Sequence, residues 1–289
     1  MLVTLKEILE IAEEKKIAVG AFNAPNLESL QAVIGAAEEL ELPVIMQFSQ
    51  GHEGHIRLEE IGPIMMDYAK KSTVPVCVHL DHGENIEYVQ KALELGFTGV
   101  MYDGSTLEYK ENVANTKKVV ELARKFGAFA EAELGNMGRR ENGMGGKSGV
   151  GDETKIYTDP VQARAFVEET GVDALACSFG TTHGIYLAEP RLDFTVVEGV
   201  RRECGGIPVV MHGGSGVSKE DFHKAIHAGV RKVNYFTYMD KAAGNAIKEY
   251  IDSLAEGQPA FYADAALKAI AAMKENVKGA MTTFALLDE

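Results

Sequence analysis

Short apolar runs rich in β-branched residues recur along the chain, and each is followed by a stretch with apolar residues at helical spacing. The expected strands cover 18–23, 43–49, 75–81, 99–105, 129–135, 174–180, 208–214 and 232–237. Several of them begin at a proline or after a helix-ending glycine, which is typical of the turn that leads from a helix into a strand. Eight strand–helix units with short connections predict an α/β protein with a closed parallel TIM (β/α)8 barrel.

A doubly wound open sheet is the alternative, but no Gly-x-Gly-x-x-Gly follows the first strand. No linker or low-complexity tract divides the chain, so we expect residues 1–289 to form a single domain. The segment 260–285 has the apolar spacing of an amphipathic helix. It predicts an additional C-terminal helix that packs on the barrel or on a neighbouring subunit.

One connection departs from this regular pattern. Residues 136–158, after the fifth strand, hold six glycines. A long glycine-rich loop at the C-terminal end of a barrel strand is typical of an active-site flap. We therefore predict a mobile loop over 136–158.

Composition limits the classes of partner. The net charge of −14 argues against binding to nucleic acid or a membrane surface, because either role calls for a basic patch. No run approaches the length of a membrane span, and the N-terminus lacks the apolar core of a signal peptide. The three cysteines, Cys77, Cys177 and Cys204, lie in or beside apolar runs without paired spacing, which predicts reduced thiols in a cytoplasmic protein.

Three of the expected strands end in a histidine beside a glycine: His82 in HLDHG, His183 in GTTHG and His212 in HGGSG. The loops after the strands build the active site of a TIM barrel, so these histidines are expected on one face. Three neutral imidazoles with an open fourth position are the usual ligands of a catalytic zinc ion. The alternative for any one of them is a hydrogen-bonded loop residue.

The other histidines serve as a comparison. His79 is expected to be packed inside the third strand, and His52 and His55 follow the second strand on the active face, where they can reach substrate. His223 and His227 are four residues apart on a helix away from the strand ends, which predicts a solvated face.

Carboxylates accompany these histidines. Asp81 precedes His82, and we expect the two side chains to splay apart so that one holds metal and the other faces substrate; a helix cap is the alternative for Asp81. Glu131 and Glu133 alternate on the fifth strand and point to the same side, which implies a cation nearby. Asp103 ends the fourth strand at the same level. We predict that these last three support the metal-binding histidines or offer an alternative metal site.

An anion site is expected after the seventh strand. Gly213, Gly214, Ser215 and Gly216 precede a good helix N-terminus at 217–221, which offers backbone N–H groups and a hydroxyl. The end of the eighth strand adjoins it, and the loops after strands seven and eight are the usual phosphate position of barrels.

These motifs, in this order, resemble the class II ketose-bisphosphate aldolases, which include fructose- and tagatose-bisphosphate aldolases. The similarity covers nearly the whole chain and is carried by GAFNAPNLE, HLDHG, EAELGNMG, TGVDALACSFGTTHGIY, PVVMHGGSG and KVN-x-x-T. The resemblance implies a cytoplasmic carbohydrate-metabolism lyase, a homo-oligomer (dimer or tetramer) that cleaves a phosphorylated ketose reversibly to dihydroxyacetone phosphate and an aldehyde. It also implies Zn²⁺ as the cofactor that stabilises the enediolate, and it allows a monovalent cation beside it.

The resemblance also assigns roles to residues. His82, His183 and His212 match the zinc ligands, Asp81 matches the acid/base at the hydroxyl next to the cleaved bond, and Glu141 matches a loop glutamate implicated in proton transfer. A solvated loop residue is the alternative for Glu141. The positions that match substrate-binding residues are Asn23, Ser49, Gly184, Gly213, Gly214, Ser215, Asn234 and Thr237.

Several positions depart from the family pattern. Phe236 and Tyr238 stand where relatives have small or acidic residues, and Leu187 stands where many have lysine. Arg139 and Arg140 occupy the flap, and the C-terminal region lacks an arginine for a far phosphate. These departures predict that fructose 1,6-bisphosphate is not the best substrate.

Three alternatives to this interpretation remain open. A Schiff-base aldolase needs a lysine that reaches into the barrel, and Lys232, within the eighth strand, is expected at the wrong end. A zinc-dependent hydrolase or other lyase could use the same histidines but leaves HGGSG unexplained. A non-catalytic paralogue would be expected to have lost ligands or acids, and all of them are present.

Overall fold

A closed barrel of parallel strands forms the centre of the molecule in the computed structural model, which describes residues 1–135, 157–182, 184 and 190–289. The strands are β1 Leu2–Val3, β2 Val19–Asn23, β3 Val44–Ser49, β4 Val76–Gly83, β5 Gly99–Tyr102, β6 Phe129–Leu134, β7 Ala174–Cys177, β8 Val209–Met211 and β9 Val230–Tyr235. Each of β2 to β9 pairs with the next strand in sequence, and β9 pairs with β2, so these eight strands close the barrel. The short β1 pairs with the start of β4.

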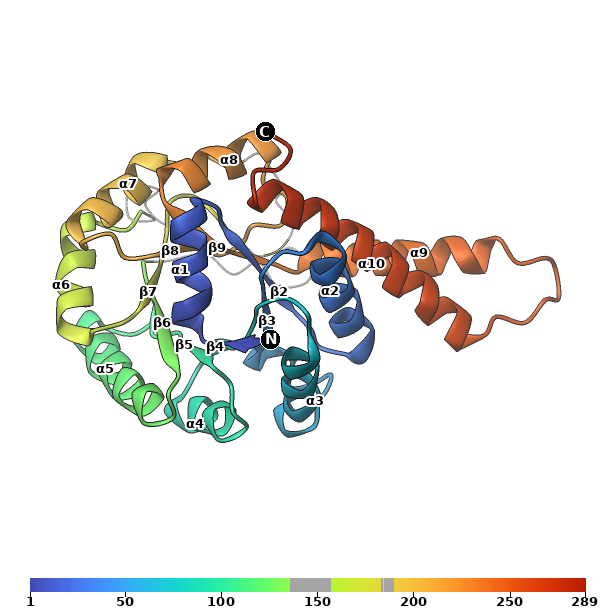
Figure 1. The fold of residues 1–289 in the computed structure, drawn as a ribbon, viewed down its shortest axis with the longest axis horizontal. Helices are drawn as coiled ribbons and strands as arrows, with labels where there is room; N and C mark the ends of the chain where they lie inside the picture. Colours follow the sequence, from blue (N-terminus) through green and yellow to red (C-terminus); the bar gives the residue numbers. More distant parts are fainter. Residues whose placement is uncertain (136–156, 183, 185–189) are drawn as a thin grey trace.

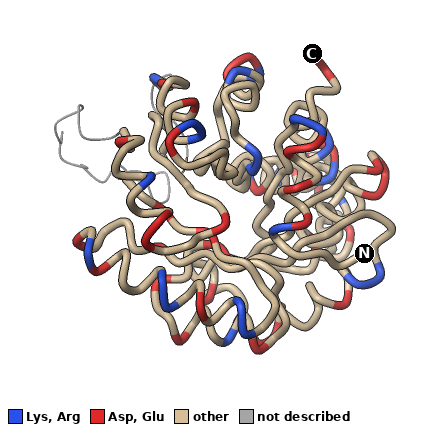
Figure 2. The backbone as a smooth tube through the Cα atoms, turned by 60° about the vertical axis from the view of Figure 1, so that its left-hand side comes forward, with Lys and Arg blue, Asp and Glu red and all other residues tan. Residues whose placement is uncertain are grey.

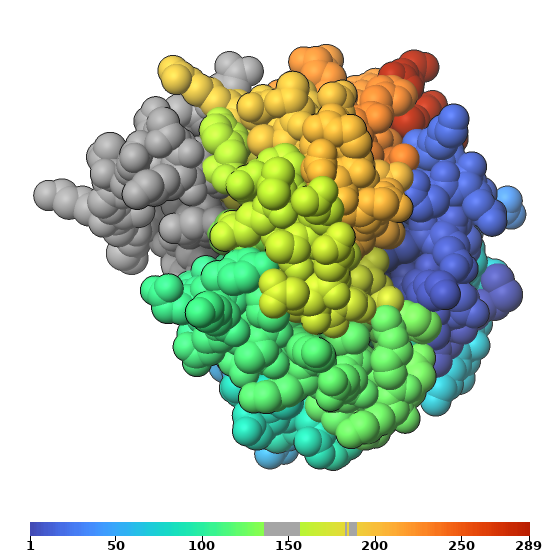
Figure 3. Space-filling model, turned by 90° about the vertical axis from the view of Figure 1, so that its left-hand side faces the viewer, coloured from blue at the N-terminus to red at the C-terminus, as the bar shows by residue number. Residues whose placement is uncertain are grey.

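Helices surround this barrel (Figure 1). They are α1 Leu5–Lys15, α2 Leu27–Leu40, α3 Leu58–Lys71, α4 Ile86–Glu94, α5 Tyr109–Lys125, α6 Pro160–Thr170, α7 Phe194–Glu203, α8 Lys219–Ala228, α9 Thr237–Asp252 and α10 Tyr262–Phe284, with a 3-10 turn η1 at Gln50–His52. Figure 3 shows one side of this ring, where α5, α6 and α7 follow one another across the surface. Basic and acidic positions are interspersed over the outer part of the molecule (Figure 2).

Local sequence signals fix where several helices begin. Asn26, Asn85 and Ser218 stand just before α2, α4 and α8, and each side-chain oxygen accepts a hydrogen bond from a backbone N–H of the first turn. Thr4 and Glu7 form a complete capping box at the start of α1. The helices α1, α2, α4 and α8 therefore each start at a residue that the sequence defines.

The helix α1 closes the end of the barrel at which the strands begin. Its fully buried Leu5 and Ile8 pack against inward-pointing side chains such as Ile45, Cys77 and Val210, which together form an apolar plug inside the barrel. Because apolar groups fill this end, the polar interior residues lie toward the opposite end, where the strands finish.

The last two helices form an antiparallel pair that extends beyond the barrel (Figure 1). The inner part of α10 packs on α9 and α2, and Phe284 is buried against Phe222. The outer part leaves apolar side chains in solvent: Ile251 is 50%, Phe261 59%, Tyr262 79% and Leu267 64% exposed.

The predicted fold is confirmed: the chain is a TIM barrel with an additional C-terminal helix. The predicted strands overran at 103–105, 178–180 and 212–214, which are loops, and positive φ angles at Gly180 and Gly213 bend the chain there. Most of the predicted flap, 136–156, lies outside the described residues. Among those described, no helix combines the length and apolar character that crossing a membrane demands.

Candidate active site

A kink at the end of β4 brings two adjacent side chains to the same side of the strand. The pairing with β5 shifts register between Leu80 and Gly83, and His82 takes a φ of +46°, a left-handed conformation that non-glycine residues rarely adopt. Asp81 Oδ1 consequently lies 3.9 Å from His82 Nε2. The expectation that these two side chains splay apart is wrong, because the bulge removes the alternation of a regular strand.

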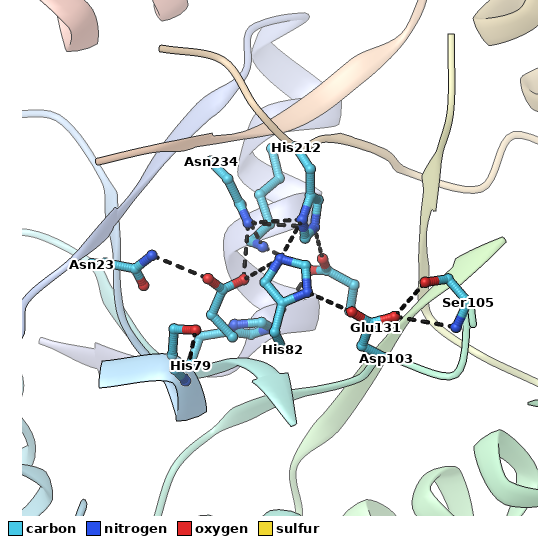
Figure 4. A network of polar contacts seen from close by, with 12 residues as sticks. Asn23, His79, His82, Asp103, Ser105, Glu131, His212 and Asn234 are labelled. Carbon is cyan, nitrogen blue, oxygen red and sulfur yellow. Dashed lines mark hydrogen bonds and ion pairs between the residues drawn. The ribbon is translucent and has the colours of Figure 1, made fainter. Parts of the chain in front are cut away.

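Two histidines face each other across the mouth of the barrel (Figure 4). His212, just after β8, places Nδ1 3.0 Å from Nε2 of His82. Behind them, His82 Nδ1 lies 2.8 Å from Asp103 Oδ2, and His212 Nε2 lies 2.9 Å from Glu131 Oε1. Carboxylates accept hydrogen bonds, so in the neutral form of each ring the rear nitrogen carries the proton and the front nitrogen presents a lone pair.

Two lone pairs at this distance repel unless a positive charge lies between them. A proton can supply that charge, and so can a metal ion, because the nitrogens of two zinc-bound histidines are separated by about 3.3 Å in a tetrahedral site. The carboxylate behind each imidazole is the usual support of a metal-binding histidine. Asp81, His82 and His212 can together direct ligand atoms at one ion, so the donor set fits a divalent metal.

The electrostatics favour positive charge at the same place. Burial alone would lower the pKa of His82, but Asp81, Asp103 and Glu133 outweigh it and raise the pKa to about 9. Burial would raise the pKa of Asp81, but His82, His212 and Lys232 lower it to about 2. Asp81 is therefore a carboxylate at neutral pH.

Two amides hold this carboxylate. Asn23, the last residue of β2, donates from Nδ2 to Asp81 Oδ2 at 3.1 Å, and Asn234 on β9 donates from Nδ2 to Oδ1 at 3.0 Å. The Oδ1 atom of Asn23 is buried and has no hydrogen-bond partner among the described residues. An acceptor left in this position suits a substrate hydroxyl.

The two glutamates of β6 point into the barrel as expected, and the expected cation is Lys232. This lysine is fully buried, and its Nζ lies 2.8 Å from Glu131 Oε2. The prediction that Lys232 lies at the wrong end is therefore corrected: two residues before Asn234 on β9, it shares the inward face. Its enclosure by Glu131 and Asn234 leaves no approach for a carbonyl carbon, so it does not suit Schiff-base chemistry.

Asp103 and Glu133 complete the acidic surroundings of His82. Their carboxylate oxygens and a His82 nitrogen lie close enough together to form a second candidate metal group. His82 and Ser105 hold the pKa of Asp103 well below its usual range in spite of burial, so it stays ionised. Asp103 and Glu133 therefore fit the predicted role of support or alternative site.

The glycine-rich loop after β8 packs closely on β9. A Cβ on Gly214 would lie 2.9 Å from the Asn234 carbonyl oxygen, and the N–H of Gly214 already donates to that oxygen. The buried Ser215 hydroxyl accepts from the backbone N–H of Phe236 at 3.4 Å. The loop thus ties the ends of β8 and β9 together just ahead of the N-terminus of α8.

The remaining candidates lie at the ends of other elements, in a loop or outside the described residues. Ser49, at the end of β3, pairs in register with Asp81; Thr237 opens α9; Gly184 adopts a φ of +93°. His183, Glu141, Arg139, Arg140 and Leu187 lie outside the described residues.

The other histidines divide as follows. His79 is fully buried 3.5 Å from Glu131, as expected. His52 packs against Phe236 with its ring tilted and the ring centres 4.8 Å apart, a contact that the sequence did not reveal. His227 is exposed as predicted, but His223 is buried against Asp288, so its predicted solvation is wrong.

A parallel barrel with a histidine and carboxylate centre at the C-terminal ends of its strands defines a metal-dependent TIM-barrel enzyme. Residues 3–288 match the family model described as fructose-bisphosphate aldolase class-II. The chain belongs to this family and is a metal-dependent aldolase, a carbon–carbon lyase. The hydrolase and the non-catalytic paralogue are not favoured.

Individual relatives agree. The chain is 41% identical over 289 residues to a probable fructose-bisphosphate aldolase of Bacillus subtilis, covering 98% of this chain and 97% of the relative. It is 39% identical to a fructose-bisphosphate aldolase of Staphylococcus aureus, with the same coverage. The crystal structure of the YdjI aldolase of Escherichia coli K12 superposes with a TM-score of 0.85 at 36% identity, covering 98% of this chain and 97% of that one.

The pKa of His82 predicts a proton-coupled metal site. With a pKa of about 9, His82 carries a proton at pH 7 in the metal-free protein, whereas a metal ligand must be a neutral imidazole. Binding of Zn²⁺ at pH 7 should therefore release about one proton from His82, and affinity should rise with pH until it levels off near pH 9. Calorimetry in buffers of different ionisation enthalpy measures the release. In Asp103→Asn the release should shrink, and a release of zero in the unsubstituted protein would contradict the assignment.

Proposed function

We propose that the protein uses Zn²⁺ to cleave a phosphorylated ketose reversibly into dihydroxyacetone phosphate and an aldehyde. The observation that carries this proposal is the pair of facing nitrogens, His82 Nε2 and His212 Nδ1, beside the ionised Asp81. His183 is the third proposed ligand, and a bound divalent ion supplies Lewis acidity at the carbonyl and hydroxyl oxygens of the substrate. Asp103, Glu131 and Glu133 orient the histidines.

Asp81 is the proposed base. Its carboxylate removes the proton from the hydroxyl on the carbon that becomes the aldehyde, the carbon–carbon bond breaks, and the electron pair passes to the dihydroxyacetone phosphate half as an enediolate. Glu141 is the proposed residue that returns a proton to that carbon. Asn23 and Asn234 keep the Asp81 carboxylate turned toward the substrate.

The phosphate of the substrate is proposed to bind at the loop after β8. Gly213, Gly214 and Ser215 bring small residues and backbone to the N-terminus of α8, which favours anions, and Gly184 and Thr237 are proposed to contact the same substrate. Ser49 is proposed to contact the substrate from the end of β3. A monovalent cation is also proposed to bind beside the zinc ion.

The assembly and setting are also proposals. The exposed Ile251, Phe261 and Leu267 on the projecting part of α9 and α10 favour contact with a second copy of the chain, as a dimer or tetramer, and the molar mass in solution measures it. The chain is proposed to act as one domain over residues 1–289. Its three free cysteines suit the cytoplasm.

Substitution of Asp81 separates proton transfer from metal binding. Asp81→Ala should keep bound zinc and lose cleavage by roughly 10²–10⁴-fold, the range for removal of a general base. His212→Ala is the matched control and should lose both zinc and activity, because it removes a ligand. Metal analysis and a coupled assay for dihydroxyacetone phosphate measure the two effects. A metal-free Asp81→Ala protein would make Asp81 a ligand or a structural residue.

Substrate preference follows from the walls of the site. Phe236 and His52 pack together close to Asp81, and we expect these rings to narrow the space for the aldehyde half. A second phosphate would lack a bidentate arginine partner of the kind some relatives supply from the C-terminal region. Fructose 1,6-bisphosphate should therefore have a lower kcat/KM than a ketose with a single phosphate. A clear preference for fructose 1,6-bisphosphate over fructose 1-phosphate would refute this expectation.

A further inference from the structure

A buried ammonium lies directly beneath the active site, and the proposed reaction assigns it no role. Lys232 is fully enclosed inside the barrel, in a polar layer with Gln47, His79 and Glu131, which are also fully buried. Burial of an ammonium costs several kcal/mol unless partners compensate for the lost water. An apolar residue would fill a barrel interior without that cost, so the contacts of this lysine require an explanation.

One contact of Lys232 determines how Asn234 is oriented. Lys232 Nζ lies 2.8 Å from Oδ1 of Asn234. A lysine can only donate hydrogen bonds, so the atom it meets must be the amide oxygen. The NH₂ end of Asn234 is thereby directed upward, where it donates to Asp81 Oδ1 at 3.0 Å. Without the ammonium, the amide could turn over and present an oxygen to the Asp81 carboxylate.

The other contact reaches the histidine pair. Lys232 Nζ lies 2.8 Å from Glu131 Oε2, while Glu131 Oε1 lies 2.9 Å from His212 Nε2. The lysine therefore fixes the glutamate whose other oxygen selects the tautomer of His212 with its lone pair on Nδ1. Two chains of contacts therefore start at Lys232 Nζ. One ends at Asp81, the proposed base, and the other ends at His212, a proposed metal ligand.

We propose that Lys232 is a positioning residue of the aldolase: it orients Asn234 toward Asp81 and Glu131 toward His212. The proposal rests on the proposed function, because the roles of Asp81 and His212 come from there. It predicts an effect on the base through Asn234 and an effect on the metal through Glu131. Asn234 Nδ2 also lies 3.4 Å from His212 Nδ1, so Asn234 contacts the proposed ligand as well.

Lys232→Met tests both effects, since methionine approximates the length of lysine without the ammonium. The dissociation constant for Zn²⁺, measured by chelator competition, and kcat at saturating zinc should each worsen by about 10- to 100-fold, as for other residues that support metal ligands. Lys6→Met, at an exposed position on α1, is the control and should change neither. Unchanged zinc affinity and kcat in a folded Lys232→Met protein would overturn the proposal.

A double-mutant comparison distinguishes positioning from general stability. Asn234→Ala should lower kcat at saturating zinc, and adding Lys232→Met should then lower kcat little further. Independent, multiplicative losses in kcat would mean that Lys232 does not act through Asn234. Trapping of Lys232 by borohydride with dihydroxyacetone phosphate would make it a nucleophile and also overturn the proposal.

A further variant guards against the case in which Lys232→Met fails to fold. Removal of one partner can leave Glu131 as an unpaired buried charge, so Lys232→Met/Glu131→Gln removes both charges. This variant should still show a lower kcat than Glu131→Gln alone, and equal values would overturn the chain of contacts through Asn234. Zinc affinity is measured without turnover, so the chain of contacts to His212 is tested even if the unsubstituted protein releases no dihydroxyacetone phosphate, a result that would refute the proposed function instead.

Discussion

The active site depends on the placement of two imidazole nitrogens, His82 Nε2 and His212 Nδ1, 3.0 Å apart with their lone pairs toward each other. This arrangement is unfavourable without a positive charge between them. Asp103 and Glu131 impose it by holding the rear nitrogen of each ring, and the bulge in β4 imposes it by turning His82 inward. The geometry is therefore favourable only when a cation, either a proton on His82 or a metal ion, lies between the two nitrogens.

Charge balance in the barrel follows from the same requirement. Asp81, Glu131 and Glu133 are all buried near the mouth, and Asp103 lies beside them, whereas Lys232 supplies one compensating charge. The excess of negative charge favours a divalent ion, which in turn can hold the oxygens of an anionic substrate. A chain with a net charge of −14 therefore meets a phosphorylated sugar through local features and not through its overall field.

Much of this arrangement could be predicted from the sequence. The strand–helix alternation gave the barrel, and the rule that strand ends build the site grouped His82, His212, Asp81 and Asn234 before any coordinates. The direction in which Asp81 points relative to His82 could not be predicted, because a bulge depends on pairing with the neighbouring strand.

The inward position of Lys232 is hard to predict for a different reason. Its position along β9 suggested the wrong end, although the period of two that it shares with Asn234 indicated the inward face. The lysine side chain is long enough for its ammonium to reach the level of Asn234 from a backbone position lower in the strand. His52 and Phe236 meet through loops from distant parts of the chain, and no local pattern reports such a contact.

The most direct test of the account is the position of the metal in crystals of the zinc-loaded protein, located by anomalous scattering at the zinc edge. We expect a peak about 2.0–2.1 Å from both His82 Nε2 and His212 Nδ1, with Asp103 and Glu131 still bound to the rear nitrogens. A peak coordinated through His82 Nδ1 or His212 Nε2, with those carboxylates displaced, would contradict it.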